Sequence, residues 1–208
     1  MNIIVLIDPS GYVFEGSMDN RLAGVQAVVE VKDTDGEWVA WEAEKFGQVN
    51  PQITNNEGSY GWDVIQGEWR VIFTKEGYKP YISRVMKVPP AETELNIPMV
   101  KLGDPIVETK EVTADNLTVS FDRYMKVSDN TLKLYKVTEA EREEVAGTVE
   151  HENKNGYSVI QVPSDKQVGY VEGDSNGETG FFAENPNEKV SKTFTFVPNE
   201  PLEKGSTY

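Results

Sequence analysis

The side chains that most often carry out catalysis without a cofactor are scarce in this sequence. The 208 residues include one histidine, His151, and no cysteine. A histidine-rich metal site needs further histidines, a Ser–His–Asp triad would have to use this single histidine, and thiolate-bound metals and disulfides are excluded. Carboxylates are abundant, but no pair stands out, whereas a glycosidase needs two held about 5–10 Å apart in a cleft. We therefore expect no enzyme activity, and we expect His151 to be a solvated residue at a strand end.

A calcium loop is the next chemistry to consider. Residues 174–178 read Asp-Ser-Asn-Gly-Glu and place oxygen ligands at alternate positions around a glycine, which is part of the pattern of calcium loops. The bidentate glutamate at the twelfth position and the flanking helices of that pattern are missing. We favour a metal-free turn and no cofactor. The open alternative is Ca²⁺, for which the ligands would be Asp174, Asn176 and Glu178.

Two tryptophans are candidates for ligand binding, because aromatic faces can stack on sugars. Trp38 and Trp41 are three residues apart, so on a strand they point to opposite faces and only one of them can be buried. We favour a purely structural role for both, and the exposed one is the best candidate for a ligand contact. Tyr60, Trp62 and Trp69 alternate with polar residues and are expected in a core instead.

Charge and composition exclude several partners. Asp and Glu outnumber Lys and Arg by 35 to 20, which gives a net charge of -15, so we expect neither nucleic acid nor an anionic membrane as a partner. Hydrophobic residues are 38% and charged residues 26% of the chain, as in globular proteins. The apolar run at residues 3–7 is too short for a signal peptide or a membrane helix and predicts a strand. An exported protein would therefore carry its signal upstream of this sequence.

The elements that must position these residues are short strands. In the first half, Val25, Ala27, Val29 and Val31 alternate with mostly polar residues, and Asp-Gly at residues 35–36 favours a tight turn. The alternating residues 60–64 and 69–73, separated by Gly67, predict a hairpin whose aromatic side chains centre the core.

The second half repeats this pattern after a Gly- and Pro-containing link at residues 101–105. We predict domains at residues 1–101 and 102–208, and an all-β fold of two tandem β-sandwich domains. Residues 138–144 are expected to form a turn of helix. The expected strands of the second half are residues 106–112, 117–121, 131–137, 145–149, 157–162, 168–171 and 192–197.

The first half resembles the carboxypeptidase-regulatory-like (transthyretin-like, or prealbumin-like) family. The resemblance lies in residues 55–78, which contain an Asn-rich turn, Tyr-Gly-Trp-Asp-Val, Gly67, an alternating strand and the pair Gly77-Tyr78. Residues 22–29, Leu-Ala-Gly-Val-Gln-Ala-Val-Val, resemble the opening strand of the same family. The order and spacing of these motifs cover most of residues 5–100.

The second half resembles bacterial Ig-like domains. Residues 117–125, Leu-Thr-Val-Ser-Phe-Asp-Arg-Tyr-Met, are similar to one strand of that family, and residues 193–208 are similar to its penultimate strand and tyrosine corner. The family adds a further strand after this corner, so we expect the domain to lack its final strand here.

Both resemblances imply non-catalytic modules of large secreted or cell-surface proteins of Firmicutes. They imply an extracellular location and a role in spacing or displaying other parts of the protein, with neighbouring domains of the same longer chain as partners. One alternative is an adhesion module that binds a polysaccharide or a host or surface protein. A weaker alternative is an accessory domain of a secreted hydrolase.

Overall fold

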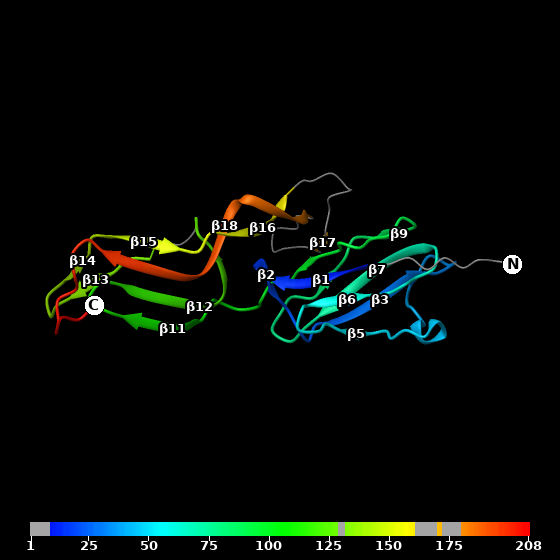
Figure 1. Cartoon of the computed structure of the whole chain (residues 1–208), viewed down its shortest axis with the longest axis horizontal. Helices are drawn as coiled ribbons and strands as arrows, with labels where there is room; N and C mark the ends of the chain where they lie inside the picture. The colour runs from blue at the N-terminus through cyan, green and yellow to red at the C-terminus, as the bar shows by residue number, and fades with distance from the viewer. Residues whose placement is uncertain (1–8, 129–131, 161–169, 172–179) are drawn as a thin grey trace. The chain divides into compact units, whose positions relative to one another are not determined.

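The computed structural model describes residues 9–128, 132–160, 170–171 and 180–208, with side chains described outside residues 157–187 (Figure 1). The fold is all-β, as predicted, with one short 3-10 helix, η1 (Ala43–Phe46), among the described residues. The chain divides into two compact units. The first contains Met1–Leu102 and Tyr157–Asn185, and the second contains Gly103–Gly156 and Pro186–Tyr208.

The first unit has two groups of paired strands. In one group, β1 (Ser10–Glu15) pairs with β10 (Ile97–Pro98), β2 (Ser17–Arg21) and β6 (Ser59–Gly61). The other group has the order β4 (Trp38–Ala40), β3 (Gln26–Lys32), β7 (Gly67–Thr74), β8 (Tyr81–Ile82), with β5 (Gln52–Ile53) on β3 and β9 (Met86–Val88) on β7. The strand β17 (Tyr170–Val171) pairs with β8.

Alternation in the sequence becomes alternation of burial in this unit. Ala27 and Val29 of β3 and Trp69, Val71 and Phe73 of β7 are fully buried, while the residues between them face outward with partial exposure. Tyr60 and Trp62 are 5% and 1% exposed. The predicted aromatic core is therefore confirmed.

The predicted hairpin of residues 60–64 and 69–73 is wrong. β6 pairs with β1, whereas β7 pairs with β3, so the two segments belong to different groups of strands. Their aromatic rings meet in the core, where the Tyr60 and Phe73 centroids lie 4.9 Å apart at 69°. Packing of rings can thus account for alternation on both segments without any hydrogen bonding between them.

The Asp-Gly turn forms as predicted. Oδ1 of Asp33 accepts hydrogen bonds from the backbone N–H groups of Asp35 and Glu37, both at 2.9 Å. Gly36 adopts a φ of 87°, which a glycine tolerates without steric cost. The acidic side chain therefore organises the turn between β3 and β4.

The second unit is built on a sheet with the order β11 (Val107–Val112), β12 (Leu117–Lys126), β18 (Gly180–Pro198). The part of β18 that belongs to this unit begins at Pro186. β15 (Gly147–His151) and β16 (Lys154–Ile160) also pair with β18. β18 has 19 residues and begins 12 residues before the strand predicted at 192–197. The absence of a final strand from this domain stays a prediction.

Residues 138–144 form part of a hairpin, which corrects the predicted turn of helix. β13 (Tyr135–Val137) pairs with β14 (Arg142–Glu144), and the N–H of Thr138 donates to the carbonyl of Glu141 at 3.0 Å. The segment has no apolar face that a helix could bury, whereas the strand pairing satisfies its backbone while leaving the charged side chains in solvent.

The core of the second unit is smaller than that of the first. Its main cluster of buried residues is Leu117, Val119, Leu134 and Phe196, with further apolar residues only partly buried around them. Val190 and Phe194 are buried outside this cluster. No helix in the described part of the chain is long and apolar enough to cross a membrane.

Candidate functional site

The two candidate tryptophans have different environments. Trp41 lies just after β4 and is 7% exposed; its ring stacks on Phe46 at 5.1 Å and meets Trp69 edge-on at 5.5 Å. Trp41 is therefore withdrawn as a ligand contact, because the core encloses it. Trp38 is partly exposed on β4, so the expectation that only one of the pair is buried is confirmed. Ligand binding by Trp38 stays a prediction.

Charged side chains surround Trp38 on the outer face of the β4–β3–β7 sheet. The guanidinium carbon of Arg70 lies 4.6 Å from the ring centroid, and Nζ of Lys32 lies 5.9 Å from it. Arg70 also bonds to the Glu30 carboxylate at 2.7 Å, and Lys32 pairs with Glu68 at 3.4 Å. The face thus offers one aromatic ring and a row of hydrogen-bonding groups, but Arg70 already occupies part of the ring.

The predicted calcium ligands Asp174, Asn176 and Glu178 lie outside the described residues, and calcium binding there stays a prediction. Among the described residues, no group of three or more His, Asp or Glu side chains could hold a metal ion.

His151 has a structural environment. Its Nδ1 donates to the carbonyl oxygen of Glu152 at 3.0 Å, and its ring lies 6.2 Å from that of Phe194. It is partly exposed at the end of β15. These contacts account for the side chain without a catalytic role.

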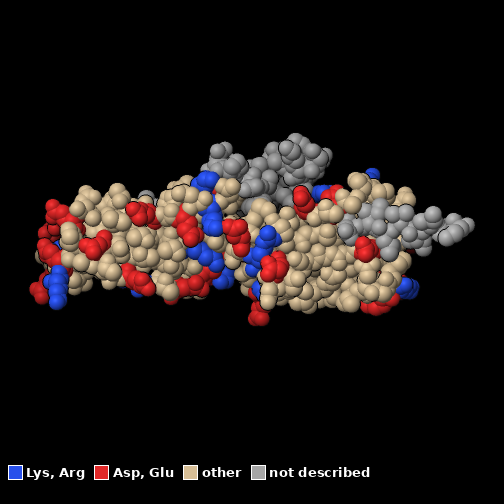
Figure 2. All heavy atoms as spheres, in the orientation of Figure 1, with Lys and Arg blue, Asp and Glu red and all other residues tan. Residues whose placement is uncertain are grey.

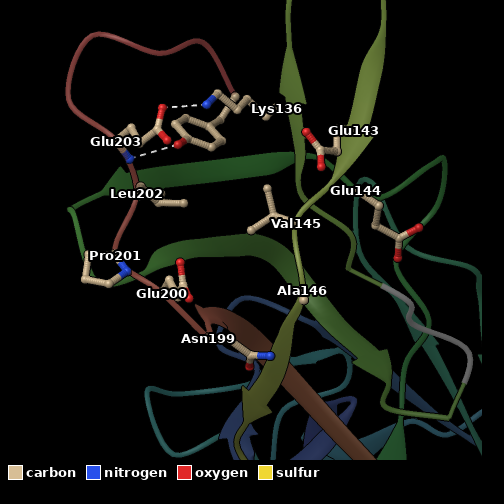
Figure 3. A pocket seen from close by; sticks show the side chains of 11 residues that line it. Lys136, Glu143, Glu144, Val145, Ala146, Asn199, Glu200, Pro201, Leu202 and Glu203 are labelled. Atoms are coloured by element: carbon tan, nitrogen blue, oxygen red, sulfur yellow. Dashed lines mark hydrogen bonds and ion pairs between the residues drawn. The ribbon is translucent and has the colours of Figure 1, made fainter.

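A hollow of about 450 Å³ opens in the second unit between the β13–β14 hairpin and the segment that follows β18 (Figure 3). The side chains of Val145 and Leu202 point toward each other across it. The residues that line it are Lys136, Glu143, Glu144, Val145, Ala146, Asn199, Glu200, Pro201, Leu202, Glu203 and Tyr208.

Hydrogen bonds hold one wall of this hollow in place. Lys136 pairs with Glu203 at 2.5 Å, Ser206 donates to Glu203 at 3.2 Å, and the N–H of Glu203 donates to the Tyr208 hydroxyl at 2.9 Å. The hydrogen bond to Glu203 raises the pKa of Lys136. The hydrogen bonds from Lys136 and Ser206 lower the pKa of Glu203, so both groups are charged at neutral pH.

The sequence does not predict this hollow, because its walls come from segments about 60 residues apart. The signals available were the pair Glu143-Glu144 and the run Glu200-Pro201-Leu202-Glu203, where carboxylates flank an apolar residue.

The first unit has a second hollow, of about 530 Å³. The side-chain oxygen of Asn96 accepts the N–H of Tyr12 at 3.2 Å there, and the hydroxyl of Tyr60 donates to the carbonyl of Leu95. Burial raises the pKa of Tyr60 well above its usual range. The Asn96 side-chain oxygen and the Tyr60 hydroxyl are thus already used in hydrogen bonds within the protein. It is lined by Ser10, Gly11, Tyr12, Met18, Tyr60, Thr93, Glu94 and Asn96.

The fold is all-β. The sites described above contain no arrangement of catalytic groups. No family model matches the chain, and no curated protein matches it. Among solved structures, it is similar to the full-length major pilin SpaD from Corynebacterium diphtheriae, with 13% sequence identity and a TM-score of 0.27. The match covers 95% of this chain and 58% of the pilin chain. A likeness at this level is too low to indicate a shared function.

Proposed function

We propose that the chain is a non-catalytic part of a larger bacterial surface or secreted protein, in which its two β units space or display neighbouring domains. One observation carries the proposal: the side chains best suited to chemistry or ligand binding are used to build the structure. Trp41, Trp62 and Trp69 are in the core, and His151 packs on Phe194. At the described surface, Arg70 covers part of the Trp38 ring, and the charged side chains there form no group that could hold a metal ion.

We further propose that the first unit is a carboxypeptidase-regulatory-like domain. Its support is the placement of the motif residues. The aromatic pair Tyr60 and Trp62 and the alternating residues after Gly67 fill the core. Gly77 adopts a φ of 81° at the Gly-Tyr corner, and Tyr78 packs against the same core. For the second unit, an Ig-like domain remains the proposal.

A replacement experiment tests the structural role. In the parent protein, an unrelated pair of β-sandwich domains of similar length is substituted for this chain. If the chain is a spacer, antibodies against the flanking domains label intact cells as before, and any binding by those domains is retained. Loss of binding with unchanged antibody labelling would contradict the proposal, because the chain itself would then be the binding element.

Binding of a polysaccharide or a surface protein is the second candidate, and the partial exposure of Trp38 favours it. A glycan array probed with the purified chain tests it. A hit that Trp38→Ala abolishes and Tyr135→Ala preserves would support this candidate, since Tyr135 is a 36% exposed aromatic residue in the other unit. An array without hits, or a hit unchanged by Trp38→Ala, would exclude a carbohydrate site at Trp38.

A further inference from the structure

The hollow between the β13–β14 hairpin and residues 199–208 combines an apolar floor with an acidic rim. Val145, Leu202 and Tyr208 are partly buried and pack against Leu117, Val119, Leu134 and Phe196. At the hollow, only these partly buried side chains separate the small core of the second unit from solvent. An occupant that covers these side chains would remove more apolar surface from water, which favours binding.

The rim carries four glutamates and one lysine. Glu203 is paired with Lys136 and Glu144 with Lys133, at 2.5 and 3.0 Å. Glu143 and Glu200 are exposed, and neither has an ion pair with another described residue. Figure 2 shows carboxylates gathered at the end of the second unit that carries β13 and β14. These two carboxylates lie beside an apolar floor and have no ion pair within the described part of the chain, so they favour a cationic occupant.

The same features decide what kind of cation fits. A metal ion does not, because the described residues offer no group of three ligands for one. The volume of about 450 Å³ is in the range of pockets that hold organic groups, about 300–1,000 Å³. Lysine and arginine side chains have an apolar stem and a charged end, so the stem can cover Val145 and Leu202 while the end reaches Glu143 or Glu200.

We propose that this hollow binds a lysine- or arginine-bearing segment of a partner protein. The inference goes beyond the proposed structural role, since a spacer needs no such site, and either can fail without the other. The acidic rim favours a positively charged segment. The apolar floor favours a segment with apolar atoms next to that charge.

The test adds increasing concentrations of the whole chain to a fluorescein-labelled peptide of alternating lysine and leucine. Binding is measured as the rise in fluorescence anisotropy of the peptide. A peptide of alternating glutamate and leucine is the charge control. We expect saturable binding of the basic peptide only, weakened by added salt because the rim charges are exposed. The absence of saturable binding would overturn the proposal.

Matched variants separate the hollow from the general acidity of the chain. The double variant Glu143→Gln and Glu200→Gln is expected to raise the Kd for the basic peptide about fivefold. Replacing Glu108 and Glu111 of β11, which are equally exposed acidic residues outside the hollow, is expected to leave the Kd within about twofold. Equal weakening by both pairs would show non-specific attraction and would overturn the proposal.

A measurement on the unmodified chain makes the result independent of the variants. The methyl resonances of Val145 and Leu202 are expected to shift on addition of the basic peptide, while those of Val107 and Val112 on β11 stay in place. Shifts confined to residues outside the hollow would also overturn the proposal.

Discussion

The guanidinium of Arg70 lies 4.6 Å from the centre of the Trp38 ring and is held there by the Glu30 carboxylate at 2.7 Å. A ligand that stacks on Trp38 must therefore displace Arg70 or use the part of the ring that Arg70 leaves open. The residue before Arg70 is Trp69, which is fully buried. Neighbouring positions on β7 thus serve the core and the outer face.

Two tryptophan substitutions should differ strongly in their effect on stability. Trp69→Ala empties a fully buried site and is expected to lower the free energy of unfolding by about 3–5 kcal/mol. Trp38→Ala, on the outer face, should cost less than about 1 kcal/mol. Urea unfolding followed by circular dichroism measures both. Similar losses for the two variants would contradict the assignment of core and outer face.

Alkaline pH should destabilise the first unit through two buried tyrosines. Burial raises the pKa of Tyr60 and of Tyr81 above the ordinary value of 10.0. Above pH ~10 the unfolded chain releases these protons while the folded chain retains them, so stability is complete below that pH and falls as the pH rises. Thermal melts between pH 8 and 12 measure the loss.

Tyr81→Phe is the variant that tests this pH dependence, and it should flatten the decline in melting temperature above pH ~10. The control is Tyr135→Phe. Because Tyr135 is 36% exposed, this substitution should leave the decline in melting temperature unchanged. An identical decline in all three proteins would exclude the buried tyrosines as its cause.

Arg123 should hold the start of the second unit against β12. Its guanidinium donates to the carbonyls of Gly103 and Asp104 at 2.6 and 3.0 Å and to the Asp122 carboxylate at 3.0 Å, and Arg123 is only 9% exposed. Arg123→Lys keeps the charge but cannot form this planar set of bonds. We expect Arg123→Lys to lower the free energy of unfolding by about 1.5–3 kcal/mol.

Amide hydrogen exchange locates this effect. The N–H of Ile106 donates to Oδ1 of Asp122 at 3.0 Å, so the exchange of the Ile106 amide should accelerate in Arg123→Lys. Arg142→Lys, at an exposed position in β14, is the control and should leave this exchange unchanged. Unaltered exchange in the Arg123 variant would contradict the role given to this side chain.

Removal of calcium should not change the melting temperature of the chain, because a metal-free turn is the favoured interpretation of residues 174–178. A ligand that binds only the folded state must raise the melting temperature. We therefore expect the same melting temperature with excess chelator as with millimolar calcium. A rise with calcium that disappears in Asp174→Asn would instead support a site formed by Asp174, Asn176 and Glu178.

The sequence was sufficient to predict which residues are buried where alternation is strong. Val29 and Val71 could be placed in the core because a strand with one buried face has a period of two. It was not sufficient to predict which strands pair. Tyr60 and Phe73 alternate in the same way whether their strands hydrogen-bond or only pack ring against ring, so the predicted hairpin was wrong.

The candidate sites show the same limit. Spacing predicted that Trp38 and Trp41 could not both be buried, but the position of Arg70 over Trp38 depends on the register between β3, β4 and β7. The acidic hollow depends on Leu202 and Val145 facing each other across it, and no local pattern indicates that these distant segments come together.

Labelling of intact cells tests the central claim most directly. Antibodies raised against the purified chain are applied to intact and to lysed cells of the source organism, and to the culture supernatant. A structural module of a surface or secreted protein predicts labelling of intact cells or a signal in the supernatant, in a product longer than these 208 residues. A signal found only after lysis would contradict the proposed function.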